Sequence, residues 1–144
     1  MFSFIFLNHP ESFPIDESRI ARIFEMISSS LDIPQHGILN IAFLSDYEIQ
    51  VLNRDHRGID STTDVLSFHY FDDFSDLSAD QVAGEIILSE SRIVSQALEH
   101  GHSCERECEI LIIHSILHIL GYDHETDEEY DEMWTIESPL RMQL

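Results

Sequence analysis

The sequence contains no lysine, and seven arginines face 28 acidic residues. The net charge is therefore −21, and the isoelectric point is about 4.4. Such a chain cannot cover a long stretch of nucleic acid or an anionic membrane with a basic face. An anionic substrate would have to be bound at a small local site, by a few arginines or by a metal ion.

Cysteines are scarce, and long apolar segments are absent. Cys104 and Cys108 are the only two cysteines, and their spacing in a predicted helix is a poor geometry for a disulfide. The longest mostly apolar stretches, Phe2–Leu7 and Ile110–Leu120, are shorter than the ~18–20 residues of a membrane span. The N-terminus lacks the basic region and the cleavage site of a signal peptide. These features predict a cytoplasmic protein with no membrane partner.

The length and the apolar content predict one folded domain. The chain has 144 residues, of which 43% are hydrophobic, and only five glycines and four prolines. A chain of this length buries enough surface to form a core, and this composition excludes a disordered chain or a collagen. We find no repeat and no linker, so residues 1–144 are expected to form a single domain.

Hydrophobic periodicity and capping residues predict the element order β-α-β-α-β-β-α-α-α. The predicted strands are Phe2–Leu7, Ile38–Leu44, Asp64–Tyr70 and Val82–Leu88. The predicted helices are Asp16–Leu31, a short one after the capping box Ser45–Glu48, one from Ser89 to Gly101, one from Ser103 to about Leu120, and one from Thr126 or Asp127 to near Pro139. Two adjacent strands in this order favour an α+β fold with a mixed sheet of about four strands and about five helices.

Three histidines near the end of the fourth predicted helix have the spacing of metal ligands. His114 and His118 lie one helical turn apart, about 6 Å along the axis and about 40° around it, so both imidazoles can reach one ion. Gly121 tolerates a positive φ and lets the chain turn back after the helix. His124 can then supply a third nitrogen. Three protein ligands with one position left open for water are typical of catalytic zinc.

The spacing is that of the zincin peptidase motif H-E-x-x-H-x-x-G-x-x-H, with one departure. The glutamate that acts as general base in those peptidases is replaced by Ser115, whose hydroxyl is too weakly basic for that role. The sequence thus predicts a zincin-like metal helix without the peptidase base. A base from elsewhere, such as Glu85 or an aspartate, stays open.

Three blocks of the chain belong together: the run HSILHILGYDH at residues 114–124, Leu52–Arg57 with Asp60 and Thr63–Phe68, and Gly84–Leu88. In sequence and order they resemble the YbeY family of bacterial rRNA maturation endoribonucleases. The run HSILHILGYDH is similar to the family motif H-G-x-L-H-L-x-G-Y-D-H, with Ser115 in place of the usual glycine. Leu52–Arg57, Asp60 and Thr63–Phe68 resemble the family's L-N-x-x-Y-R-x-x-D-x-x-T-[DN]-V-L-S-F block. Gly84–Leu88 resembles its G-[DE]-I block. His56 and His69 stand at less strict positions.

This resemblance implies a zinc-dependent, single-strand-specific endoribonuclease in 16S rRNA 3′-end maturation and ribosome quality control. It implies one zinc ion per chain, held by His114, His118 and His124, and it assigns Arg57 to the position of the catalytic arginine. Zinc activates water and polarises a phosphoryl oxygen, and a guanidinium stabilises charge that develops on the phosphate. The expected partners are ribosomal RNA and small-subunit particles, with no DNA expected.

Two other functions stay open at this stage. One is a zinc metallopeptidase, which has the ligand spacing but lacks the glutamate base. The other is a non-catalytic ribosome-assembly factor in which zinc only joins the helix to the following turn. Arg57 separates these functions, since it is essential only to the nuclease. We expect Arg57 on a loop, where its alternative role is a surface ion pair with Asp55 or Asp60.

A second group of potential ligands lies at the start of the same helix. His100, His102, Cys104 and Cys108 are close in sequence, but their spacing matches no common zinc pattern. We interpret this segment as a helix-entry turn with two small buried thiols.

Overall fold

One four-stranded sheet runs through the computed structural model, which describes residues 1–143. The strands are β1 (Ser3–Phe6), β2 (Ile38–Leu44), β3 (Val65–His69) and β4 (Val82–Ser89). The helices are α1 (Glu17–Ser30), α2 (Asp46–Arg57), α3 (Glu90–His100), α4 (Cys104–Ile119) and α5 (Asp127–Met142). The predicted element order and the α+β class are confirmed.

The sheet is mixed, as the sequence predicts. Its strand order is β1-β2-β4-β3, with β1 and β4 both parallel to β2 and with β3 antiparallel to β4. The two parallel pairs need crossover helices, which α1 and α2 supply in their chain order. β3 is consequently an edge strand, and it packs on α4.

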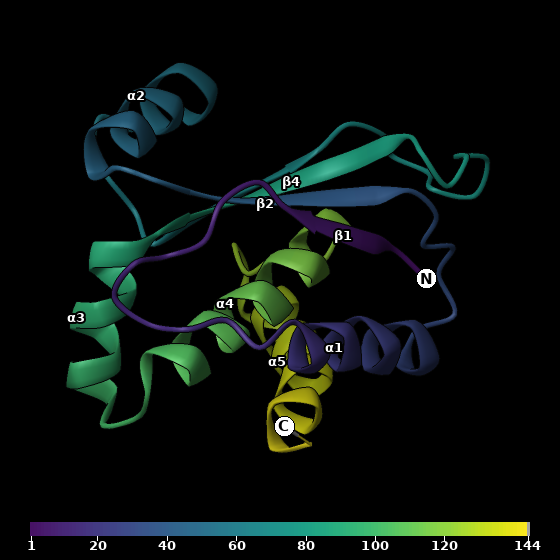
Figure 1. Ribbon diagram of the computed structural model, residues 1–144. Coiled ribbons are helices and arrows are strands. Elements are labelled where there is room, and N and C mark those ends of the chain that lie inside the picture. Colours follow the sequence, from purple (N-terminus) through teal and green to yellow (C-terminus); the bar gives the residue numbers. More distant parts are fainter. Residues whose placement is uncertain (144) are drawn as a thin grey trace.

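The two faces of the sheet carry different helices. Figure 1 shows α2 alone above one face, with α1, α4 and α5 below the other. A small buried cluster lies under α2, formed by Ala42, Ile49, Leu66 and Ile87. The main core fills the opposite side and includes Ile112, Ile113, Ile116 and Leu117 of α4. α4 is therefore the central buried helix.

Gly84 is required where β4 runs between its two neighbours. A Cβ atom at this position would lie 2.3 Å from the backbone carbonyl oxygen of Phe68 in β3. Any larger residue would push the strands apart at the end of their pairing. The glycine in the sequence block Gly84–Leu88 thus has a packing reason.

The last helix is longer than the sequence predicts. Pro139 was expected near its end because proline removes one helical hydrogen bond, but α5 continues to Met142 with Pro139 inside it. Leu140 is only 2% exposed, and Arg141 forms an ion pair with Glu137 one turn earlier, at 3.3 Å. These contacts beyond the proline keep the last turn helical.

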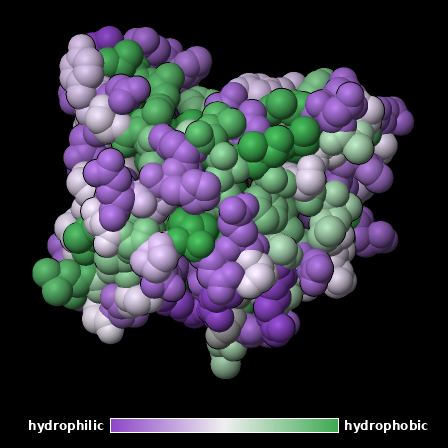
Figure 2. Space-filling model, viewed as in Figure 1, coloured by the Kyte–Doolittle hydropathy of each residue, from purple (hydrophilic) through white to green (hydrophobic). Residues whose placement is uncertain are grey.

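The surface seen in Figure 2 mixes hydrophilic side chains with smaller hydrophobic areas. Large apolar side chains are exposed singly on several elements, for example Leu98 on α3 and Tyr47 on α2. None of the helices within residues 1–143 is long and apolar enough to cross a membrane.

Candidate metal centre

The three histidines singled out by their spacing come together at the end of α4. Their ring centroids are 4.7 Å apart for His114 and His118, 5.0 Å for His118 and His124, and 5.6 Å for His114 and His124. One ring nitrogen from each lies within 4.8 Å of the others. Three imidazoles in this arrangement are a donor set that suits zinc, and also nickel or copper.

The turn after α4 brings the third imidazole into place. Gly121 has a φ of 105°, which is the left-handed region that glycine tolerates. The amide of Tyr122 donates to the carbonyl of Leu117 at 3.0 Å, and the amide of Gly121 donates to that of His118 at 3.0 Å. This pair of bonds is a Schellman motif, which ends the helix and reverses the chain. His124 then reaches back toward the helix.

The electrostatics of the cluster keep His118 neutral. Burial, with the neighbouring His114 and His124 and the positive charge of Arg57, lowers the pKa of His118 from 6.5 to about 4, while Asp123 opposes the shift. A neutral imidazole has a free lone pair, which is the form that binds a metal ion. His118 is therefore ready to act as a ligand at neutral pH.

The lowered pKa of His118 predicts acid sensitivity of the metal-free protein. Between pH 6.5 and pH 4 the unfolded chain binds a proton at His118 that the folded chain does not, so stability falls as the pH falls. We expect His118 to lower the free energy of unfolding by about 2 kcal/mol over this range. This value already allows for the partial exposure of the side chain. Urea unfolding with a chelator should show a flatter pH profile for His118→Gln than for the wild type. If the free energy of unfolding fell equally steeply with falling pH in the two proteins, the lowered pKa of His118 would be contradicted.

A buried carboxylate, which the sequence did not predict, orients His114. His114 Nδ1 lies 3.0 Å from Oε1 of Glu137, whose side chain is 5% exposed. Burial raises the pKa of Glu137, but His114 and Arg141 outweigh burial and lower it overall. A carboxylate that accepts the Nδ1 proton leaves Nε2 free for a metal ion, as is usual for metal-binding histidines. The available signal was a glutamate on the apolar face of the last helix, one turn from both Met133 and Leu140.

Arg57 lies at the last position of α2 rather than on a loop. Neither Asp55 nor Asp60 forms the predicted ion pair with Arg57. Asp55 pairs with Arg54 at 3.3 Å, and Asp60 accepts a hydrogen bond from Gln50 at 3.1 Å. Within residues 1–143 no carboxylate forms an ion pair with Arg57, and its positive charge contributes to the lowered pKa of His118. Arg57 therefore has a guanidinium without an ion pair in the described residues, and its charge acts on His118.

Ser115 lies in the buried interior, on the side of α4 away from solvent. It is 0% exposed, and its hydroxyl has no hydrogen-bond partner among the described residues. It therefore cannot replace the glutamate base of the zincin peptidases. Glu85, a possible substitute base, is held by a hydrogen bond from the Tyr70 hydroxyl. The geometry gives the peptidase alternative no added support.

Replacing Ser115 by alanine should stabilise the protein by about 1 kcal/mol. The change removes an unsatisfied buried hydroxyl, which costs roughly 1–3 kcal/mol, and introduces the best helix former. Ser115→Gly should be less stable than Ser115→Ala by about 1 kcal/mol, because glycine is a poor helix former. Urea unfolding of the three proteins measures both differences. A destabilised Ser115→Ala would contradict the assignment of an unpaired hydroxyl.

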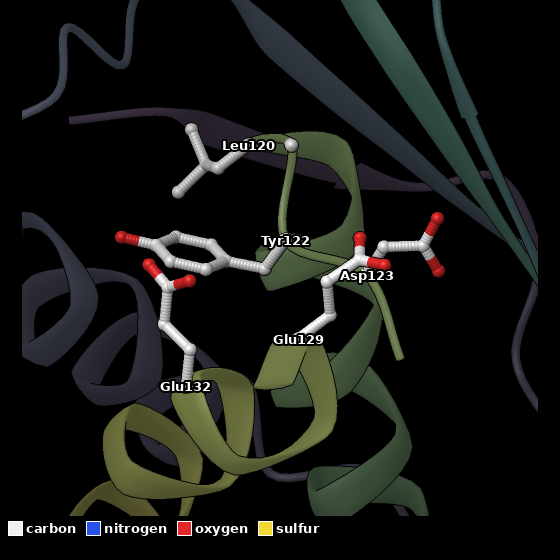
Figure 3. Close-up of a pocket in the computed structure, with 6 residues that line it drawn as sticks. Leu120, Tyr122, Asp123, Glu129 and Glu132 are labelled. Atoms are coloured by element: carbon white, nitrogen blue, oxygen red, sulfur yellow. The ribbon is translucent and has the colours of Figure 1, made fainter. Parts of the chain in front are cut away.

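A pocket with acidic walls adjoins the turn that carries His124. Figure 3 shows it between the residues after α4 and the first turns of α5, with Tyr122 lying beside Glu132. Asp123, Glu129 and Glu132 contribute carboxylates, and burial, followed by the charge of Glu132, raises the pKa of Tyr122. The wall of the pocket is therefore negatively charged.

The fold and the histidine cluster define an α+β protein with a candidate metal-dependent hydrolase centre. The sequence matches the family "Endoribonuclease YbeY" over residues 7–144, and the chain belongs to this family.

Similar proteins agree with this family assignment. The endoribonuclease YbeY of Clostridioides difficile is 41% identical over 124 residues, which are 83% of this chain and 81% of the relative. That of Enterococcus faecalis is 32% identical over 94% of this chain and 92% of the relative. The solution structure of TM1509 from Thermotoga maritima is similar over 99% of this chain and 88% of that chain, with a TM-score of 0.58 and 25% identity.

Proposed function

We propose that this chain is a zinc-dependent, single-strand-specific endoribonuclease of the cytoplasm that acts in 16S rRNA 3′-end maturation and ribosome quality control. Family membership supports the endoribonuclease activity. The observation that carries the proposal is the clustering of three imidazoles within 4.8 Å near an arginine that has no ion pair in residues 1–143. We further propose that residues 1–144 act as one catalytic domain.

Each residue of the site has a distinct part in this proposal. His114, His118 and His124 would hold one zinc ion, which activates water and polarises a phosphoryl oxygen. Glu137 fixes the ring of His114 through the 3.0 Å contact at Nδ1. Arg57 would bind a phosphate oxygen of the RNA with its planar guanidinium and stabilise the charge that develops during cleavage.

The small number of available arginines argues for a docked substrate. Arg19 and Arg141 neutralise the buried Glu109 and Glu137, and Arg54 pairs with Asp55. A net charge of −21 leaves little attraction for free RNA. We therefore propose that specificity comes from docking on a small-subunit ribosomal particle. Weak binding to naked RNA is expected, and tight binding with a steep salt dependence would count against docking.

Cleavage of a single-stranded RNA that carries the 16S 3′ region tests the proposal. The zinc-loaded protein should cleave it, whereas a chelated sample and His114→Ala should not. The same RNA annealed to its complement should resist cleavage. If naked RNA is not cut although zinc is bound, the assay is repeated on small-subunit particles.

Absence of cleavage on both substrates would refute the nuclease proposal. If zinc also remained bound to His114, His118 and His124, the result would favour the assembly factor with a structural zinc ion. Cleavage that persists in the chelated sample would refute the zinc dependence alone.

A further inference from the structure

A second group of imidazoles meets a buried carboxylate at the opposite end of α4. His100 ends α3, His102 follows the left-handed Gly101, and Glu107 lies in the first turn of α4. Oε1 of Glu107 lies 2.5 Å from Nδ1 of His100 and 3.0 Å from Nε2 of His102. His114 and His118 follow Glu107 by seven and eleven positions of the same helix, about 10 and 16 Å along its axis, so this group is distinct from the candidate metal centre.

The sequence predicts a helix-entry turn with two buried thiols here. Cys108 is indeed buried, and burial raises the pKa of its thiol to about 12, but Cys104 is only partly buried. The two histidines turn to Glu107 rather than to either thiol. The burial of Glu107 could not be predicted from sequence, because glutamates at helix N-termini are commonly exposed.

The carboxylate of Glu107 differs from the two other buried glutamates in its counter-charge. Glu109 is paired with Arg19, and Glu137 is paired with Arg141. Glu107, which is 3% exposed, has only the imidazoles of His100 and His102 as ion-pair partners within residues 1–143. An imidazole carries a full positive charge only when it is protonated, and the helix N-terminus contributes roughly half a charge. A buried carboxylate needs a full positive charge nearby to offset the cost of its burial.

We propose that His100, His102 and Glu107 form a second metal site, which binds a divalent transition-metal ion of the zinc class. Two imidazoles and one carboxylate are an established zinc donor set. The three ligand atoms lie within 4.8 Å of one another. Ligand atoms of tetrahedral zinc lie about 3.3 Å apart, so the contacts of 2.5 and 3.0 Å need to open only slightly.

The exposure of the ligands suits the entry of an ion. The side chains of His100 and His102 are 54% and 28% exposed, whereas the carboxylate lies beneath them at 3%. An ion can therefore arrive from solvent and neutralise the buried charge. A bound ion would join the end of α3 to the start of α4, and so fix the helix that carries His114 and His118.

Zinc titration of the full chain, initially stripped of metal, tests the second site. Calorimetry should give two zinc ions per chain for the wild type and one for Glu107→Gln, which keeps the shape of the side chain but removes its charge. His114→Gln should instead lose the other ion and keep the one at Glu107. His9→Gln is the matched control, because His9 faces a single glutamate, Glu17, at 3.7 Å, and it should bind two ions.

A measurement on the unmodified protein keeps the test independent of folding defects. Imidazole nitrogen signals of His100 and His102 in NMR spectra should shift when zinc is added beyond one equivalent. If these signals stay unchanged under a several-fold excess of zinc, or if the wild type binds a single ion that Glu107→Gln retains, the second site is refuted.

Discussion

Arg57→Ala is expected to lower the rate of RNA cleavage by about 10²–10³-fold while the zinc content stays at the wild-type level. Arg57 has no ion pair within residues 1–143, so its removal breaks no ion pair, although its charge acts on His118. The loss should therefore appear in kcat, as loss of a group that stabilises charge in the transition state. Single-turnover cleavage of the 16S 3′ RNA, together with metal analysis, measures both quantities.

Arg54→Ala is the matched control for Arg57→Ala. Arg54 lies on the same helix and is paired with Asp55 on the surface, so its loss should leave cleavage within about twofold of the wild type. Arg57→Lys should recover only part of the rate, because an ammonium group cannot bind two phosphate oxygens in a planar fork. Equal losses in Arg54→Ala and Arg57→Ala would mean that both arginines act through general charge.

The clustering of His114, His118 and His124 could be predicted from spacing, because helix geometry and one glycine determine it. The i, i+4 pair shares a helix face, and Gly121 adopts the positive φ that the turn requires. The order of the four strands and five helices could also be predicted, from hydrophobic periodicity and from capping residues. The role of the three imidazoles as metal ligands stays a prediction.

Partners that meet across distant segments could not be predicted in this way. Glu137 reaches His114 from another helix, 23 positions later, and sequence spacing carries no such information. The same holds for the contacts that keep α5 helical beyond Pro139, since proline's local preference was outweighed by the burial of Leu140. The predicted loop position of Arg57 is wrong, because the short polar pattern of α2 does not show where the helix ends.

Glu137→Gln is expected to weaken zinc binding at the candidate metal centre by about 10–100-fold. The carboxylate accepts the Nδ1 proton of His114 at 3.0 Å, which fixes the tautomer and makes Nε2 a better donor to the metal. A neutral amide oxygen accepts a weaker hydrogen bond from Nδ1–H than a carboxylate does. The amide NH₂ group can also turn toward the ring, where it cannot accept this hydrogen bond. Competition with a chromogenic chelator measures the affinity of each variant.

Glu109→Gln separates this effect from a general loss of stability. Glu109 is also buried and also paired with an arginine, since Arg19 donates to its two carboxylate oxygens at 2.7 and 3.0 Å. Both variants leave an arginine without its charged partner, so both should be less stable, by up to about 3–5 kcal/mol. Only Glu137→Gln should also lose zinc affinity, because only Glu137 contacts a histidine of the cluster. If the two variants bound zinc equally well, Glu137 would be a structural ion-pair residue, and the orientation of His114 would have to come from the packing of α4 alone.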